Sequence, residues 1–335
     1  MMRPVISIRA VDAAADELRV DAFAVVMATG VLSVAARNTG HPLLASGLAW
    51  VAPPTLVVLI ALAVLRFARR GSAFAPSLTR LDHETGRYTL VAACGILGTR
   101  FGSASSVADA SLGVAACALW LGLLPLLVRA VRASGRGELV GRARGSWLLV
   151  VVGTEAVAAT AAVFVRDTRV PGLAAASAAL WLLGLLLYAV ITALVVVRAT
   201  RALRPADFTP DTWVLLGALA SGALAGGVLA EVVAPGWRTA VSTVDIAVWV
   251  AASAWGPALL LGEVWRVRAG FVPGYDHHRW ATVFPLAMYA SACSTLVTAT
   301  GLPFLALLAR VVFWCALALW CAMVVGWLWN LVTRP

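Results

Sequence analysis

One acidic side chain lies in the middle of an apolar stretch in which charges are rare. Glu155 directly follows Gly153 and Thr154, and Ala159 and Ala162 share its face on a helix through this stretch. A carboxyl group removed from water favours its neutral form, so such a residue can bind and release a proton. We consider two interpretations of Glu155: a proton site for coupled transport, or a hydrogen-bonded structural acid at a helix contact.

A second candidate is the pair Phe284-Pro285, inside the apolar run 280–300. Proline removes one backbone hydrogen bond from a helix and bends it just before the ring. A bend of this kind can direct the preceding aromatic side chain across a cavity. We therefore interpret Phe284 as a pore gate and Pro285 as its hinge. The alternative is an ordinary proline kink, which membrane helices tolerate, with Phe284 packed or facing lipid.

Other charged residues lie near or inside apolar runs. Arg37 and Arg100 each end such a run, where they either attract anions to a pore mouth or lie among lipid headgroups. Asp245 and Arg310 lie deeper in their runs, and we expect them to form a structural pair between neighbouring helices.

The sequence contains no pattern typical of a metal site, a haem site or a nucleotide site. The five cysteines lie inside apolar runs without CxxC spacing, and the four histidines lie in predicted loops. We expect no enzymatic activity, no metal and no cofactor.

The composition is that of a membrane protein. Of 335 residues, 61% are hydrophobic and only 13% are charged, whereas an average soluble domain has about 25% charged residues. The mean hydropathy is +0.91, and many apolar runs are long enough to cross a hydrocarbon core of about 30 Å. These features predict an all-α polytopic membrane protein, with an N-terminal segment at 1–20 that is not a cleaved signal peptide and one transmembrane domain at 21–332.

The apolar runs predict ten spans. They lie at 21–37, 44–66, 88–105, 107–129, 146–165, 173–198, 212–233, 239–266, 280–300 and 303–331, with a very short connection at 102–106.

Arginine predicts the orientation of these spans. All 26 basic residues are arginine, and 20 of them lie at the two termini or in the connections after spans two, four, six and eight. Five lie in the opposite connections, and Arg310 lies in a span. The positive-inside rule therefore places both termini in the cytoplasm of a multi-pass protein of the cell membrane. The same distribution argues against a nucleic-acid surface.

The spans pair as five hairpins, because the outer connections are short and the inner ones are long. The first span of each pair carries a mark of small or kinking residues near its middle. In chain order these marks are Thr29-Gly30, Cys94-Gly95, Gly153-Thr154, Gly217 and Phe284-Pro285. We expect the odd spans to line a central pore with these marks. We expect the even spans to lie outside and to direct Trp120, Trp181, Trp249, Trp255, Trp314 and Trp320 toward lipid.

The segment Phe-Ala-Val-Val-Met-Ala-Thr-Gly-Val-Leu-Ser at 23–33 resembles the first helix of the tellurite-resistance/dicarboxylate transporter family. This family includes bacterial tellurite-resistance channel homologues, fungal malate permeases and plant slow-type anion channels. Gly153-Thr154, Tyr275-Asp276 and the segment 280–289 also resemble its members, in the same order. The resemblance implies ten helices around a pore of quasi-fivefold symmetry, assembly as a homotrimer, and a phenylalanine, here Phe284, that occludes the pore midway.

Two positions depart from the family pattern. Ala28 stands where glycine is expected, and Glu155 stands where an uncharged polar residue is expected. Because an ionised Glu155 in a pore would repel an anion, two functions stay open. One is transport of small anions through a pore closed by Phe284. The other is a proton-coupled carrier for a C4-dicarboxylate such as malate, or for sulfite or tellurite.

Overall fold

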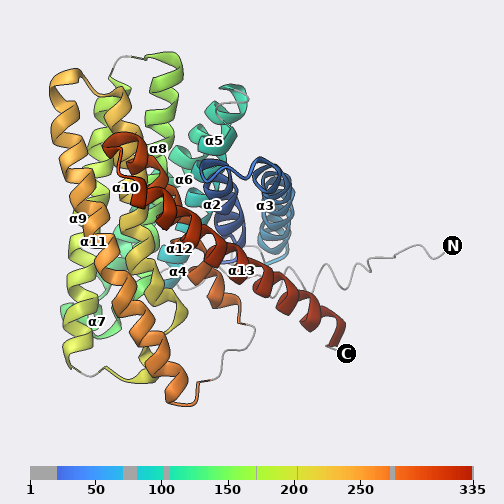
Figure 1. The fold of residues 1–335 in the computed structure, drawn as a ribbon. Coiled ribbons are helices and arrows are strands. Elements are labelled where there is room, and N and C mark those ends of the chain that lie inside the picture. The colour runs from blue at the N-terminus through green and yellow to red at the C-terminus, as the bar shows by residue number, and fades with distance from the viewer. Residues whose placement is uncertain are drawn as a thin grey trace.

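The computed structural model describes residues 21–70, 81–101, 106–170, 172–201, 203–271 and 276–333. The predicted segment 1–20, most of the connection at 102–106 and Tyr275 lie outside the described residues. Within them, every regular element is a helix (Figure 1). The predicted all-α class is thus confirmed.

Ten helices make up most of the described chain. They are α2 (Ala24–Asn38), α3 (Pro42–Arg70), α5 (Tyr88–Phe101), α6 (Ser106–Ala133), α8 (Leu149–Thr168), α9 (Leu173–Arg201), α10 (Val214–Val232), α11 (Pro235–Arg268), α12 (Trp280–Thr300) and α13 (Pro303–Thr333). Short helices and 3-10 turns lie between them: α4 (Leu81–Gly86), α7 (Arg136–Arg142), η2 (Gly145–Leu148), η3 (Pro205–Asp207), η4 (Pro210–Trp213) and η5 (His277–Arg279).

Eight of the ten helices are long and apolar enough to cross a membrane. The other two are α2, with 15 residues, and α5, with 14 residues. A helix needs about 20 residues to cross the hydrocarbon core at its rise of about 1.5 Å per residue. The structure therefore differs from the ten predicted spans in the length of these two helices.

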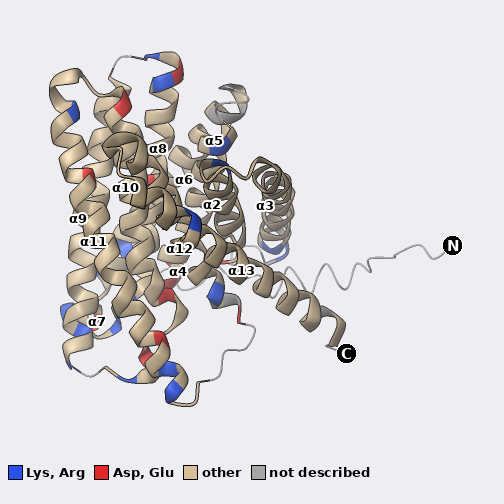
Figure 2. Cartoon of the chain, viewed as in Figure 1, with Lys and Arg blue, Asp and Glu red and all other residues tan. Residues whose placement is uncertain are grey.

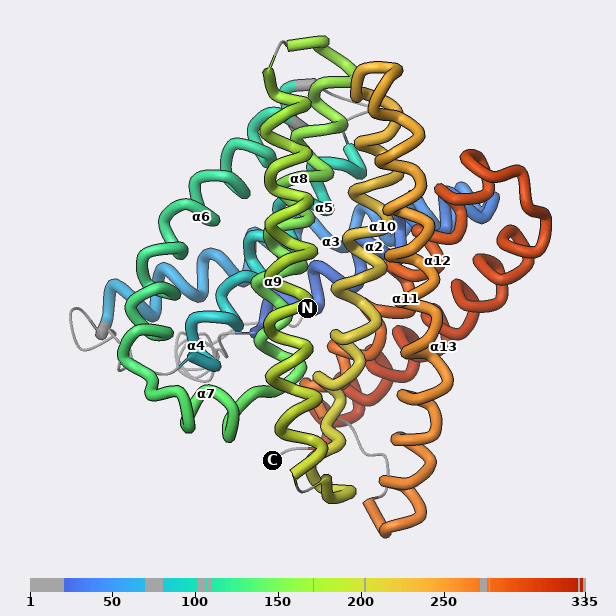
Figure 3. The backbone as a smooth tube through the Cα atoms, turned by 90° about the vertical axis from the view of Figure 1, so that its left-hand side faces the viewer, coloured from blue at the N-terminus to red at the C-terminus, as the bar shows by residue number. Residues whose placement is uncertain are grey.

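The helices contact one another in two regular patterns. Each of α2, α5, α8, α10 and α12 packs along the next long helix in the chain, which is α3, α6, α9, α11 and α13 respectively. The first five also contact one another in order, and α12 contacts α2, so their contacts close a ring. This last contact brings the red C-terminal part of the chain beside the blue N-terminal helices (Figure 3).

Burial separates the two sets of helices. The apolar windows of α8, α10 and α12 are 67 to 89% buried, whereas those of α3, α6, α9, α11 and α13 are 11 to 22% buried. A helix that is apolar on all sides and buried belongs to the interior of a bundle. We call α2, α5, α8, α10 and α12 the inner helices, and the helix that follows each one its outer helix.

Basic residues gather at one end of the bundle (Figure 2), around α7 and the last turns of α9 and α11. At this end α3, α6, α9 and α11 finish, and α8, α10 and α12 begin. We call it the arginine-rich end.

Candidate functional site

Phe284 lies one turn into α12 and is fully buried, with 0% of its surface exposed. Pro285 follows it inside the helix. Because proline has no amide hydrogen, the carbonyl of Ala281 lacks its usual helical partner. On the facing helix α10, a Cβ added to Gly217 would lie 2.9 Å from Cγ of Pro285, so only glycine lets α10 and the proline ring approach this closely.

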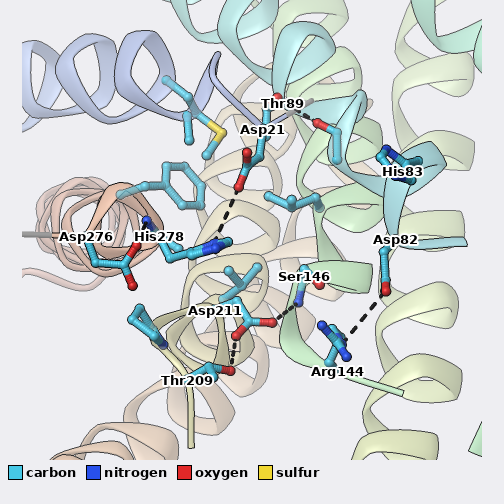
Figure 4. A pocket seen from close by; sticks show the side chains of 18 of the residues that line it. Asp21, Asp82, His83, Thr89, Arg144, Ser146, Thr209, Asp211, Asp276 and His278 are labelled. Carbon is cyan, nitrogen blue, oxygen red and sulfur yellow. Dashed lines mark hydrogen bonds and ion pairs between the residues drawn. The ribbon is translucent and has the colours of Figure 1, made fainter. Parts of the chain in front are cut away.

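A cavity of about 590 Å³ opens at the arginine-rich end, and Phe284 forms part of its wall. Its other lining residues come from the beginnings of all five inner helices, from α4 and the turns before these helices, and from the ends of α3 and α11. Figure 4 labels Asp21, Asp82, His83, Thr89, Arg144, Ser146, Thr209, Asp211, Asp276 and His278 among them. We call this cavity the vestibule. The sequence reasoning did not identify it, although an aspartate shortly before four of the inner helices was a usable signal, since helix N-termini stabilise acids.

Contacts across the vestibule join neighbouring inner helices. Asp211, before α10, accepts a hydrogen bond from the backbone N–H of Ser146, before α8, at 3.1 Å. Asp21, before α2, lies 3.6 Å from Nδ1 of His278, before α12. Both contacts are drawn in Figure 4. Asp211 and Asp21 therefore contact residues of the neighbouring inner helices. Because arginines line the vestibule as well, its charge is mixed.

Three of the glycines singled out in the sequence lie at contacts between inner helices. A Cβ added to Gly30, Gly95 or Gly153 would lie 2.9 to 3.1 Å from an atom of a neighbouring inner helix. Small residues at such points allow helix backbones to approach closely. These glycines thus allow neighbouring inner helices of the ring to lie closer to one another.

Thr29 and Thr154 occupy matching environments on α2 and α8. Each hydroxyl donates to a backbone carbonyl four residues earlier at 2.8 Å and accepts an indole N–H from an outer helix at 2.9 Å. The indole donors are Trp320 of α13 for Thr29 and Trp120 of α6 for Thr154. Both hydroxyl groups are therefore directed toward outer helices.

The same kind of contact occurs in two further hairpins. Trp181 of α9 donates to the carbonyl of Gly222 on α10 at 2.9 Å, and Trp249 of α11 donates to Sγ of Cys293 on α12 at 3.2 Å. In each case an outer helix holds the inner helix of the next hairpin. The prediction that Trp120 and Trp181 face lipid was wrong, since they are 8% and 3% exposed. A buried indole N–H needs a partner, and these inner helices supply it.

Glu155 is 1% exposed, and neither of its carboxylate oxygens has a hydrogen-bond partner. A Cβ added to Gly184 of α9 would collide with its Oε1, so the carboxyl group lies against α9, on the outer side of α8. Glu155 also lines a small cavity among the inner helices, together with Ser221 of α10 and Met288 of α12. The residue therefore lies between the ring and the helices outside it.

Arg100 and Arg37 lie at the end opposite to the vestibule. Nε of Arg100 donates to the hydroxyl of Ser33 at 2.7 Å, and its guanidinium carbon lies 5.9 Å from the centre of the Phe101 ring. Arg37 is exposed and close enough to act electrostatically on Arg100. The two residues thus place positive charge at this end of α2 and α5.

The expected pairing of Asp245 with Arg310 was wrong. Arg310 is exposed and donates from Nε to the carbonyl of Ala306 on its own helix at 3.3 Å. Asp245 is 2% exposed, and its Oδ1 has no hydrogen-bond partner. Arg310 lies on the exposed side of α13 and is directed away from the bundle. Asp245 is therefore buried without this arginine as a partner.

Comparison with known proteins gives the family. The family model of the voltage-dependent anion channel matches residues 17–328, nearly the whole chain. Uncharacterized membrane proteins of Mycobacterium tuberculosis, strains CDC 1551 / Oshkosh and H37Rv, are each 34% identical over 151 residues, which is 43% of this chain and 77% of each relative. The resemblance seen in the sequence is thereby confirmed, and the chain belongs to the voltage-dependent anion channel family of membrane channels and transporters.

Proposed function

We propose that this protein moves small inorganic or organic anions across the cell membrane through a pore enclosed by the five inner helices. Each inner helix and its outer helix form one hairpin, which gives ten spans in all. Membership of the voltage-dependent anion channel family supports anion transport. The closed ring of contacts among α2, α5, α8, α10 and α12 supports a central path.

The gate of this path is Phe284. The observation that carries this assignment is its complete burial at the wall of the vestibule, beside a proline and opposite a glycine. A hydrophobic constriction of this kind can close a pore by steric block or by dewetting. Gly30, Gly95, Gly153 and Gly217 are the proposed wall and hinge positions of the pore, with Pro285 beside the gate. Thr29 and Thr154 belong to this proposed wall through their backbone, since their hydroxyl groups face outer helices.

The proposed orientation places the arginine-rich end and both termini in the cytoplasm, following the positive-inside rule. Arg37 and Arg100 then lie at the outer mouth, where they attract anions. Assembly as a homotrimer follows from the family resemblance.

The purified protein in liposomes tests this proposal with a panel of chloride, nitrate, malate and sulfite at two pH values. We expect flux of at least one of these anions above that of empty liposomes. Folded, correctly inserted protein that passes none of them would contradict the proposal. A rate that is independent of pH favours a channel.

A second candidate function is a proton-coupled carrier, and the unpartnered carboxyl group of Glu155 favours it. In that case Glu155→Gln abolishes the pH dependence of uptake and leaves anion exchange intact. Glu231→Gln is the matched control, because Glu231 is exposed and pairs with Arg166 at the surface. Wild-type pH dependence in Glu155→Gln would eliminate this role.

A further inference from the structure

Two carboxyl groups inside the helix bundle are buried without a cation. Glu155 of α8 is 1% exposed and Asp245 of α11 is 2% exposed. Glu84, which is equally buried, has Arg87 at 3.0 Å. No ion pair in the described residues involves Glu155 or Asp245, and three of their four oxygens are buried without a hydrogen-bond partner. Such an arrangement is costly for two ionised groups.

The two carboxyl groups, from α8 and α11, lie against the same face of α10. A Cβ added to Gly222 would lie 3.5 Å from Oε1 of Glu155, and one added to Gly226 would lie 2.5 Å from Oδ1 of Asp245. These glycines are four residues apart, which is about one helical turn. The two carboxyl groups are therefore about one turn apart along α10, close enough for the charge of Asp245 to act on Glu155.

The space around the pair admits little besides a proton. The indole of Trp181 lies against Gly226, with Cζ2 2.9 Å from the added Cβ, and its N–H is already bonded to the carbonyl of Gly222. The free volume of the small cavity beside Glu155 is about 20 Å³, which holds about one water molecule. A metal cation would need several more oxygen ligands than this site provides.

The neighbouring titratable groups do not neutralise the pair. The buried ones on the helices around it are Cys94 of α5, Tyr188 of α9, and Tyr289 and Cys293 of α12. The arginines of α5, α8, α9 and α11 in the described residues lie in the first or last turns of these helices, away from the pair. Tyrosine and cysteine side chains carry no positive charge in any protonation state. A proton from the solution can neutralise a carboxylate here and needs no further space.

We propose that Glu155 and Asp245 form a buried proton-binding pair between the inner and outer helices. Binding converts a carboxylate and a proton from solution into one carboxylic acid, and the two groups titrate as a coupled unit. The use of this pair in transport rests on the proposed function, whereas the binding of the proton does not.

The pair also has a physical connection to the gate. Glu155 lines the small cavity together with Met288, which lies one turn after Phe284 on α12. Gain or loss of a proton changes the charge beside that turn. The pair can therefore communicate the pH to α12.

Infrared spectroscopy of the protein in lipid nanodiscs tests the inference, because protonated carboxyl groups absorb apart from carboxylates. We expect a protonated carboxyl band at neutral pH in the wild type. Glu155→Gln and Asp245→Asn should each reduce this band, and each should change the pH at which the remaining acid titrates. Glu231→Gln, at an exposed carboxylate, should leave the band unchanged. A band that is absent from the wild type, or unaltered in both variants, overturns the proposal.

A second set of variants covers the case in which the amide variants do not fold. In Gly184→Ala the added methyl group meets Oε1 of Glu155, so the band should shift. Gly256→Ala on α11 adds a methyl group in open space and should not shift it. An unshifted band in Gly184→Ala overturns the placement of the proton on Glu155.

Flux of chloride, nitrate, malate and sulfite, measured after reconstitution of the same protein preparations into liposomes, separates this inference from the proposed function. Flux without a protonated pair overturns the inference alone. A protonated pair in a protein that passes no anion overturns the transport proposal alone.

Discussion

The ring of Phe284 lies against the backbone of Gly217, such that a Cβ at position 217 would lie 3.1 Å from Cε1 of the ring. Glycine is thus the residue that makes room for the proposed gate. In most helices an alanine in place of glycine is favourable by up to about 1 kcal/mol. Here the added methyl group must displace either the ring or α12.

We therefore expect Gly217→Ala to lower the thermal unfolding temperature of the protein in detergent. Overpacking of a close contact costs about 1–3 kcal/mol, which exceeds the gain in helix propensity. Gly122→Ala on α6 is the control, since a Cβ there meets nothing within 4 Å. Its unfolding temperature should equal or exceed that of the wild type. A stabilised Gly217→Ala would show that the contact is loose.

Phe284→Ala should raise anion flux in proteoliposomes, because it removes the ring that closes the proposed pore. Phe313→Ala provides a matched control: Phe313 is equally buried at 0% exposure, but it lies on the outer helix α13. Loss of either ring should cost stability by about 3–5 kcal/mol, so only flux distinguishes them. Equal flux in the wild type and a folded Phe284→Ala would remove the gate assignment.

Trp120→Phe and Thr154→Val should be energetically coupled. The indole N–H of Trp120 and the hydroxyl of Thr154 form a hydrogen bond of 2.9 Å between α6 and α8. Polar contacts between membrane helices give coupling energies of about 0.6 kcal/mol in double-mutant cycles. A cycle of unfolding free energies measures this value directly. Trp120→Phe with Thr29→Val is the control, because Thr29 is bonded to Trp320 instead, and that pair should be additive.

Arg37→Gln should slow anion flux at low ionic strength. An exposed cation near a pore mouth raises the local anion concentration, and salt screens this effect over about 10 Å at 0.1 M. The difference from the wild type should vanish at high salt. Arg238→Gln, at another exposed arginine in the first turn of α11, serves as the control. A rate deficit that persists at high salt would indicate a structural role for Arg37.

Much of the helical organisation follows from the sequence because apolar length and arginine position are local signals. The span predicted at 280–300 coincides with α12, and 173–198 lies within α9. The short helices α4 and α7 were not predicted, because their residues are polar and their contacts are not local. Helix length at α2 and α5 also depends on the turns that precede and follow them rather than on hydropathy.

The environment of individual side chains was less accessible to sequence reasoning. The identity of Trp120 or Trp181 does not reveal which neighbour accepts its N–H, since the acceptors lie on the next hairpin. The burial of Asp245 could not be predicted either. A single acid in an apolar run suggests a pair with a basic residue of a neighbouring helix, and only the positions of the neighbouring helices show that no such pair forms. Glu155 was identifiable because its depth within an apolar run needs no partner to be recognised.

The contacts of the last hairpin, α12 and α13, with α2 make the order of synthesis matter. Trp320 and Thr29, which hold the last hairpin to the first helix, are separated by 291 positions in the chain. Long-range contacts of this kind form late, after the intervening chain has been ordered. Until the last hairpin has been translated, one side of α2 is uncovered and the hydroxyl group of Thr29 lacks the N–H of Trp320. Before the last hairpin is inserted, the ring of inner helices is therefore open between α10 and α2. The arrival of α12, which contacts both, closes it.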